Sequence, residues 1–175
     1  LHLEHAAAAL RADREVVLEA IRACDEDDDD APEHWRAFEH AADELKRDRA
    51  FILSAIAIHH FILAFVADEA KGDRDFMFAA VTSSCRGHLA LQFASDGLRA
   101  DPDLILEALR RQDQVTRDAP AEARHSLIEG LSKQDEDALR VRSVLFSAAP
   151  CLRSDPDFVL AAVRACPWAL RDASE

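Results

Sequence analysis

A pattern that recurs five times along the chain constrains its fold more than any other feature. Each copy can be aligned on an aspartate, and these marker residues are Asp13, Asp48, Asp73, Asp101 and Asp155. An alanine stands seven residues after each marker, an aliphatic residue stands eight after it, and positions three to five after it are apolar. A basic residue stands two positions before each marker. Agreement at this many positions indicates tandem structural repeats.

The repeated positions have a consistent physical interpretation. Each marker aspartate is predicted to be a structural helix cap, whose carboxylate accepts backbone N–H groups of the helix that follows. Pro102 and Pro156 directly follow two of the markers, where proline suits the first helical position. The basic residue two positions before each marker suits the C-terminal end of a preceding helix. Each copy is therefore expected to be a short helix, a tight turn and a second helix with a wide apolar face.

The repeats predict an all-α chain of tandem helix-turn-helix units that form a right-handed type of α-solenoid over residues 1–175. The expected units are 1–24, 36–60, 61–86, 89–112, a degenerate copy at 113–140, 143–167, and the start of a further unit at 168–175. An acidic insertion, 25–35, separates the first two units. Because the pattern is interrupted at both ends, we expect the chain to be a piece of a longer array.

Composition agrees with this interpretation. The chain of 175 residues is 49% hydrophobic, contains four glycines and carries a net charge of −13. The scarcity of glycine favours helices, and the negative charge argues against nucleic acid and anionic membranes as partners. It is compatible with protein partners that carry a basic surface. The four cysteines show no CxxC pair, so we expect reduced thiols in a reducing compartment, the cytoplasm or the stroma or matrix of an organelle.

Three stretches carry a resemblance to a known family: 91–109 (LQFASDGLRADPDLILEAL), 3–21 and 38–56. They resemble the helical-repeat family called domain of unknown function 4116 (DUF4116), which occurs in algae, other protists and giant viruses. The resemblance covers most of the chain except the acidic insertion and residues 111–140. The family has no known activity, so the resemblance implies the repeat and adds no chemistry.

The acidic insertion is the most strongly charged segment, and it contains Asp25, Glu26, Asp27, Asp28, Asp29 and Asp30. Carboxylates suit divalent cations, but the run lacks the glycine and the ligand spacing of an EF-hand loop. A solvated loop is therefore expected, and docking of a protein partner is the alternative.

The histidines do not predict a metal site. His59 and His60 are adjacent, so we expect them on different faces of one helix rather than as a ligand pair four residues apart. His5 and His40 stand where two other copies carry phenylalanine, so they are expected to pack as aromatic rings.

One short segment contains residues of the types that nucleophilic enzymes use: Ser83, Ser84, Cys85 and His88. A thiol or hydroxyl nucleophile also needs an oriented base and a pocket, and no glycine-rich turn or oxyanion-donor motif accompanies these residues. We therefore expect no catalytic residues, no cofactor and no metal.

The apolar run 50–67 has Ser54, His59 and His60 as its only polar residues. Its 18 residues are long enough to suggest a membrane span. The repeat register instead assigns it to the second helix of one unit and the first helix of the next. We expect a buried core, with an apolar docking surface or a membrane span as the alternatives.

These observations favour a non-catalytic scaffold that mediates protein–protein interaction, such as a peripheral subunit of a larger cytoplasmic or organellar assembly. The chain is not expected to span a membrane, although peripheral contact with a membrane complex is compatible with the sequence. The alternative is a regulatory or recognition module of a longer protein whose catalytic domain lies outside this chain.

Overall fold

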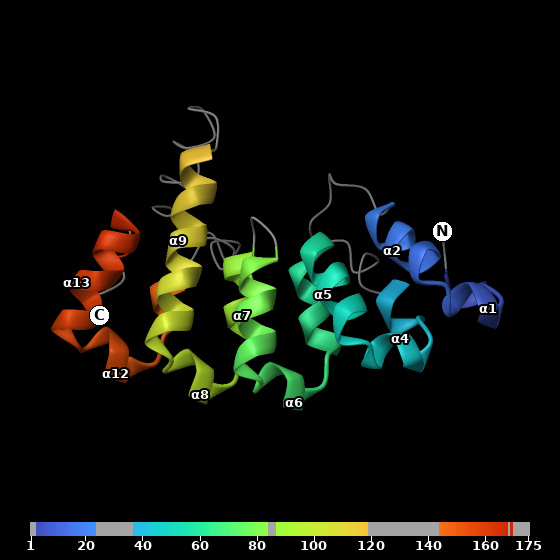
Figure 1. Cartoon of the computed structure of the whole chain (residues 1–175), viewed down its shortest axis with the longest axis horizontal. Helices are drawn as coiled ribbons and strands as arrows, with labels where there is room; N and C mark the ends of the chain where they lie inside the picture. Colours follow the sequence, from blue (N-terminus) through green and yellow to red (C-terminus); the bar gives the residue numbers. More distant parts are fainter. Residues whose placement is uncertain (1–2, 24–36, 84–86, 119–143, 168, 170–175) are drawn as a thin grey trace, which may run out of the picture.

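The computed structural model describes residues 3–23, 37–83, 87–118, 144–167 and 169 (Figure 1). Every regular element in these ranges is a helix, which confirms the all-α class. The acidic insertion lies outside the described residues. So do the expected degenerate copy, except for residues 113–118, and the expected further unit, except for Ala169.

Five longer helices follow the five marker aspartates. They are α2 (Arg14–Arg22), α5 (Arg49–Ile58), α7 (Arg74–Thr82), α9 (Pro102–Asp118) and α13 (Pro156–Ala165). Consecutive members of this series contact one another, and they stand side by side in chain order in Figure 1. The helices after the markers therefore form one continuous row, in which α9 and α13 are direct neighbours.

The segment before each marker is not the single short helix expected from the sequence. A one-turn helix directly precedes each marker: α1 (Ala8–Arg11), α4 (Asp43–Arg47), α6 (Asp68–Lys71), α8 (Asp96–Arg99) and α12 (Pro150–Arg153). A separate short helix lies before four of these: η1 (Leu3–His5), η2 (His60–Phe65), η3 (Gly87–Phe93) and α11 (Val144–Ser147). Residues 37–39 are likewise helical before α4. The first half of the repeat is thus divided in two.

A small residue six positions before each marker divides the segment. These residues are Ala7, Ala42, Ala67, Ser95 and Ala149. Each has a ψ angle between 145° and 156°, which is outside the helical range and ends the preceding turn. The single-helix expectation is therefore wrong, because this residue adopts an extended conformation in every copy.

The extended residue also joins neighbouring copies. The backbone N–H of Ala149 donates to the carbonyl of Arg99 in the preceding copy, with an N···O distance of 2.8 Å. Equivalent bonds run from Ala42 to the Arg11 carbonyl and from Ser95 to the Lys71 carbonyl. The break thus supplies a backbone donor that a continuous helix would have used internally.

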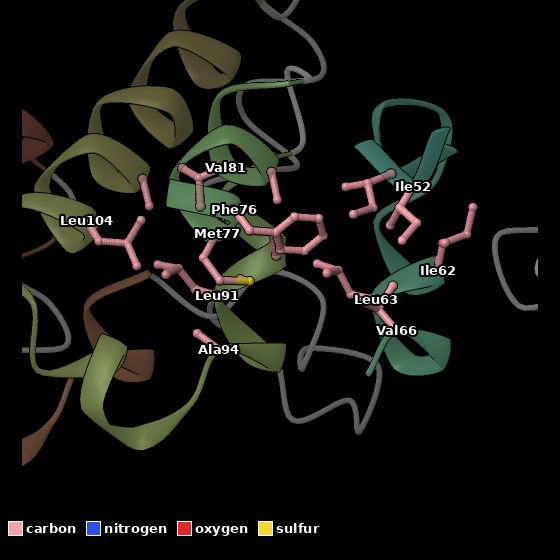
Figure 2. Packing of buried hydrophobic residues seen from close by; sticks show 14 of the residues in the cluster. Ile52, Ile62, Leu63, Val66, Phe76, Met77, Val81, Leu91, Ala94 and Leu104 are labelled. Atoms are coloured by element: carbon pink, nitrogen blue, oxygen red, sulfur yellow. The ribbon is translucent and has the colours of Figure 1, made fainter. Parts of the chain in front are cut away.

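The core lies where the long helices of the row pack against one another and against the short helices that precede the markers. In α7 the side chains of Phe76, Met77, Ala80 and Val81 are at most 1% exposed. Figure 2 shows Phe76 and Met77 lying between Leu104 of α9 on one side and side chains of η2 on the other. Full burial of a side chain of this size contributes about 1.5–3 kcal/mol, so the contacts between copies stabilise the fold.

The apolar run 50–67 is part of this core. It forms α5 and η2, and its side chains Phe51, Ile56, Ile62 and Leu63 are at most 1% exposed. Across the described ranges, no helix combines the length and the apolar character needed to cross a bilayer.

Candidate functional site: contacts between copies and an arginine-lined cavity

Each marker aspartate lies at the N-terminus of its long helix. Asp101 is typical, because its Oδ1 accepts hydrogen bonds from the backbone N–H groups of Asp103 at 3.0 Å and Leu104 at 3.2 Å. Equivalent side-chain bonds to backbone N–H groups are made by Asp13, Asp48, Asp73 and Asp155. Such bonds satisfy donors that have no partner inside the helix. These carboxylates are thus engaged by the fold itself.

The arginine that follows a marker pairs with the marker of the next copy. The three pairs are Arg14 Nη1–Asp48 Oδ2 at 3.1 Å, Arg49 Nη2–Asp73 Oδ1 at 3.1 Å and Arg74 Nε–Asp101 Oδ2 at 2.6 Å. We call them the inter-copy ion pairs. The fourth marker is followed by Pro102, which has no side-chain donor. The series therefore ends at the junction between α9 and α13.

Backbone N–H groups and the inter-copy ion pairs together lower the pKa of two markers. The backbone N–H of Phe76 and the guanidinium of Arg49 hold the pKa of Asp73 below its ordinary value. Partial burial alone would raise the pKa of Asp101, but hydrogen bonds from Arg74 and from backbone N–H groups outweigh burial and lower it. The hydrogen bond to Asp101 in turn raises the pKa of Arg74. Both aspartates therefore stay ionised further into the acid range than an unpaired aspartate would.

A second repeated charge lies at the C-terminal end of each one-turn helix. The basic column comprises Arg11, Lys46, Lys71, Arg99 and Arg153, all of them half-buried. Two of its members pair with an aspartate three residues earlier: Lys46 Nζ lies 3.9 Å from Asp43 Oδ1, and Lys71 Nζ lies 3.0 Å from Asp68 Oδ1. These two lysines are therefore neutralised locally.

The three arginines of the basic column differ from the lysines. In the described part of the chain, no carboxylate pairs with Arg11, Arg99 or Arg153, and the Nε atom of each is buried without a hydrogen-bond partner. Arg99 Nη2 donates to the backbone carbonyl of Gln92 at 2.8 Å. The Arg153 guanidinium lies 5.6 Å from the centre of the Phe146 ring. A guanidinium has five N–H donors, so these side chains keep unused capacity to bind an anion.

Arg99 lines a cavity of about 220 Å³ at the junction where the inter-copy ion pairs end. The cavity is partly open to solvent and lies between η3 and α8 of one copy and α11 of the next. Its lining residues are His88, Leu89, Gln92, Arg99, Val144, Phe146 and Ser147. The Gln112 side chain in α9 holds one wall, because its Oε1 accepts a 3.2 Å hydrogen bond from the Val144 N–H.

The histidines are placed differently from the sequence expectation. His59 is extended, with φ −144° and ψ 114°, so α5 ends before it. The His59 and His60 rings consequently stack, with centroids 5.4 Å apart, instead of pointing to different faces of a helix. His5 is exposed and His40 half-buried, so the expected ring packing is not found at His5. Within the ranges the structure covers, no three histidine, cysteine or acidic side chains form a group that could hold a metal ion.

The Ser–Cys–His segment is only partly described. Ser83 donates its hydroxyl to the Ala80 carbonyl at 2.7 Å, and His88 lines the cavity. Ser84 and Cys85 lie outside the described residues, as does the whole acidic run 25–30. Of the other cysteines, Cys166 is buried and Cys151 is exposed, and Cys24 also lies outside the described residues. The described part therefore brings only His88 of this segment to a cavity.

The sequence did not predict the cavity, and it did not identify Arg99, which lines the cavity, as a binding residue. The basic column was visible as a pattern, but it indicated only a favourable helix end. The distinction between the three arginines and the two lysines depends on which side chains find a carboxylate. An aspartate stands three residues before each lysine, whereas Ala8 and Pro150 stand three residues before Arg11 and Arg153. Only the structure shows that Arg99 bonds the Gln92 carbonyl and not Asp96, three residues before it.

A family model described as domain of unknown function (DUF4116) matches residues 13–69 and 71–120, which together make up more than half of the chain. Neither a curated protein nor a solved structure matches the chain.

Proposed function

Since the chain belongs to the DUF4116 family, whose description specifies no activity, we propose from its geometry that it is a non-catalytic scaffold for protein–protein interaction. In this proposal the row of helix pairs is a right-handed α-solenoid, and the chain is a peripheral subunit of a larger assembly.

One observation carries the proposal: two kinds of contact recur between neighbouring copies. The extended small residue donates a backbone hydrogen bond to the preceding copy at three junctions. The inter-copy ion pairs link three successive junctions. Contacts made only between nearest neighbours produce an elongated molecule with a large surface, and proteins of this kind use that surface to bind partners.

The charge of the chain narrows the class of partner. A net charge of −13 favours encounter with proteins that carry a basic surface, because complementary potentials raise the association rate. This long-range attraction weakens as salt shortens the Debye length. Partners that depend on it should therefore be lost at high salt.

Affinity capture from the lysate of the source cells tests the proposal. The intact chain is immobilised beside an unrelated helical protein of equal net charge, and retained proteins are identified at low and at high salt. We expect a defined set that binds the chain and not the control. If the chain retains nothing beyond the control at either salt concentration, the scaffold proposal is rejected.

A further inference from the structure

We propose that the cavity beside Arg99 binds an acidic side chain, aspartate or glutamate, presented by a partner protein next to an apolar residue. This inference rests on the proposed scaffold function, and it adds a site and a partner chemistry to it. The site would be specific and local, in contrast to the diffuse attraction between the acidic chain and basic partners.

The charge of Arg99 supports an anionic ligand. Asp96 stands three residues before Arg99, as Asp68 stands before Lys71, yet the guanidinium of Arg99 donates to the Gln92 carbonyl instead of pairing with an acid. A half-buried cation without a counter-ion is incompletely compensated. A carboxylate in the cavity would supply the missing charge and form charge-assisted hydrogen bonds with the guanidinium.

The composition of the cavity supports a mixed ligand. Gln92 and Ser147 add polar groups beside Arg99, whereas Leu89, Val144 and Phe146 are apolar. Phe146 is 44% exposed, so its ring extends the apolar surface beyond the cavity. The guanidinium of Arg153 lies against the same ring and adds a second uncompensated cation nearby. A carboxylate with an adjoining apolar group matches this arrangement.

The size of the cavity favours a side chain over a complete small-molecule ligand. Sites for drug-sized ligands have volumes of about 300–1,000 Å³, whereas this cavity has about 220 Å³. It can hold one acidic side chain while the rest of the ligand lies on the surface, where Phe146 and Arg153 are placed to contact it. A peptide segment of a partner protein satisfies both conditions.

The test uses the intact chain and a display library of random twelve-residue peptides. We expect selection to enrich an acidic residue beside an apolar one. Replacing that acid by its amide should weaken binding about tenfold, the loss expected for a hydrogen bond between charged groups. Binding should also shift the NMR cross-peak of the Arg99 Nε–Hε group, which is a local readout.

Three variants locate the site on the protein. Arg99→Gln should weaken the selected peptides about tenfold, and the matched change Arg11→Gln, in the same column of the first copy, should leave their affinity unchanged. Arg99→Lys guards against a folding defect, because lysine occupies this column in two other copies. It keeps the charge and loses the planar donor fork, so it should weaken binding less than Arg99→Gln.

Each other outcome counts against the inference. If the selected peptides contain no enriched acid, or bind Arg99→Gln as tightly as the parent chain, the cavity is not an acid-binding site. If free hexanoate shifts the Arg99 cross-peak as effectively as the peptides do, the site takes small organic acids and the partner-protein form is wrong. The scaffold proposal is judged separately: lysate partners that bind Arg99→Gln and the parent chain equally would preserve the scaffold and reject this site.

Discussion

Replacing Gly87 by alanine should destabilise the protein, because η3 begins in direct contact with the end of α7. A Cβ atom built on Gly87 would lie 2.0 Å from the Val81 carbonyl oxygen and 3.0 Å from the Ala80 carbonyl oxygen. Real Cβ contacts essentially never fall below 3.0 Å, so one segment would have to move by about 1 Å. Both obstacles are backbone atoms, which cannot move aside as a flexible side chain can.

The expected magnitude follows from this geometry. Overpacking typically costs about 1–3 kcal/mol, and a backbone obstacle places Gly87→Ala near the upper end. Loss of glycine also restricts the unfolded chain and returns about 0.4–1 kcal/mol. The net loss in the free energy of unfolding should therefore be about 2 kcal/mol, with a fall in Tm of roughly 4–8 °C for a chain of this size.

Gly97→Ala is the matched control. A Cβ atom at Gly97 in α8 meets nothing within 4 Å, so this variant should be neutral or more stable by up to about 1 kcal/mol. Urea denaturation followed by far-UV circular dichroism measures both variants, and equal m values would show that the same surface is exposed on unfolding. If Gly87→Ala is as stable as Gly97→Ala, η3 does not contact α7 as closely as described.

Further predictions concern the caps and the fixed alanine. Asp101→Ala should lower the free energy of unfolding by about 1 kcal/mol in urea denaturation, because the side chain caps α9. Ala108→Leu should lower the free energy of unfolding by roughly 1–3 kcal/mol, because Ala108 is 0% exposed. Ala8→Leu, at an exposed site, should have little effect. Equal effects of the two substitutions would contradict close packing at Ala108. The lowered pKa of Asp101 means that the unfolded state binds its proton first as the pH falls. The stability that ionised Asp101 contributes to the folded state is therefore present above about pH 4 and is lost as the pH drops through the pKa of Asp101 in the native state. Asp101→Asn should consequently reduce the fall in Tm between about pH 7 and pH 3, and an unchanged acid profile would contradict the assigned pKa direction.

Much of the helical architecture could be predicted from the sequence, because it depends on local patterns. The aspartate markers, the apolar positions after them and the resemblance to DUF4116 led to an all-α class and to the correct family. The break in the first half of each copy could not be predicted in the same way. Alanine at Ala7, Ala42 and Ala67 has the highest intrinsic helix propensity, so nothing local indicates an extended residue there. Ala149 is the exception, because Pro150 follows it and disfavours a helical conformation at the residue before it. The acceptor that stabilises it, where one is seen, belongs to the preceding copy.

The contacts between copies were also beyond sequence reasoning. Arg14, Arg49 and Arg74 stand directly after a marker, and in the sequence each is simply the first residue of a helix. Their pairing with the next marker depends on the distance between stacked helices, which no spacing along the chain reveals. His59 and His60 are a similar case. Their rings stack because α5 ends at Ile58 and His59 is extended, whereas a continuous helix would have included both residues.

The candidate site lies where the regularity of the repeat is lost. At the junction of α9 and α13, Pro102 replaces the arginine that forms the ion pairs elsewhere, and α9 has 17 residues where α7 has nine. Features that depart from a local rule without stabilising the fold are expected at functional positions more often than elsewhere. Here the departure coincides with a cavity and with Arg99, which has no acidic partner among the described residues. Pro102 does not line the cavity, so Pro102→Arg should leave peptide binding at Arg99 intact. A loss of binding in this variant would show that the missing ion pair, and not the cavity lining alone, determines recognition.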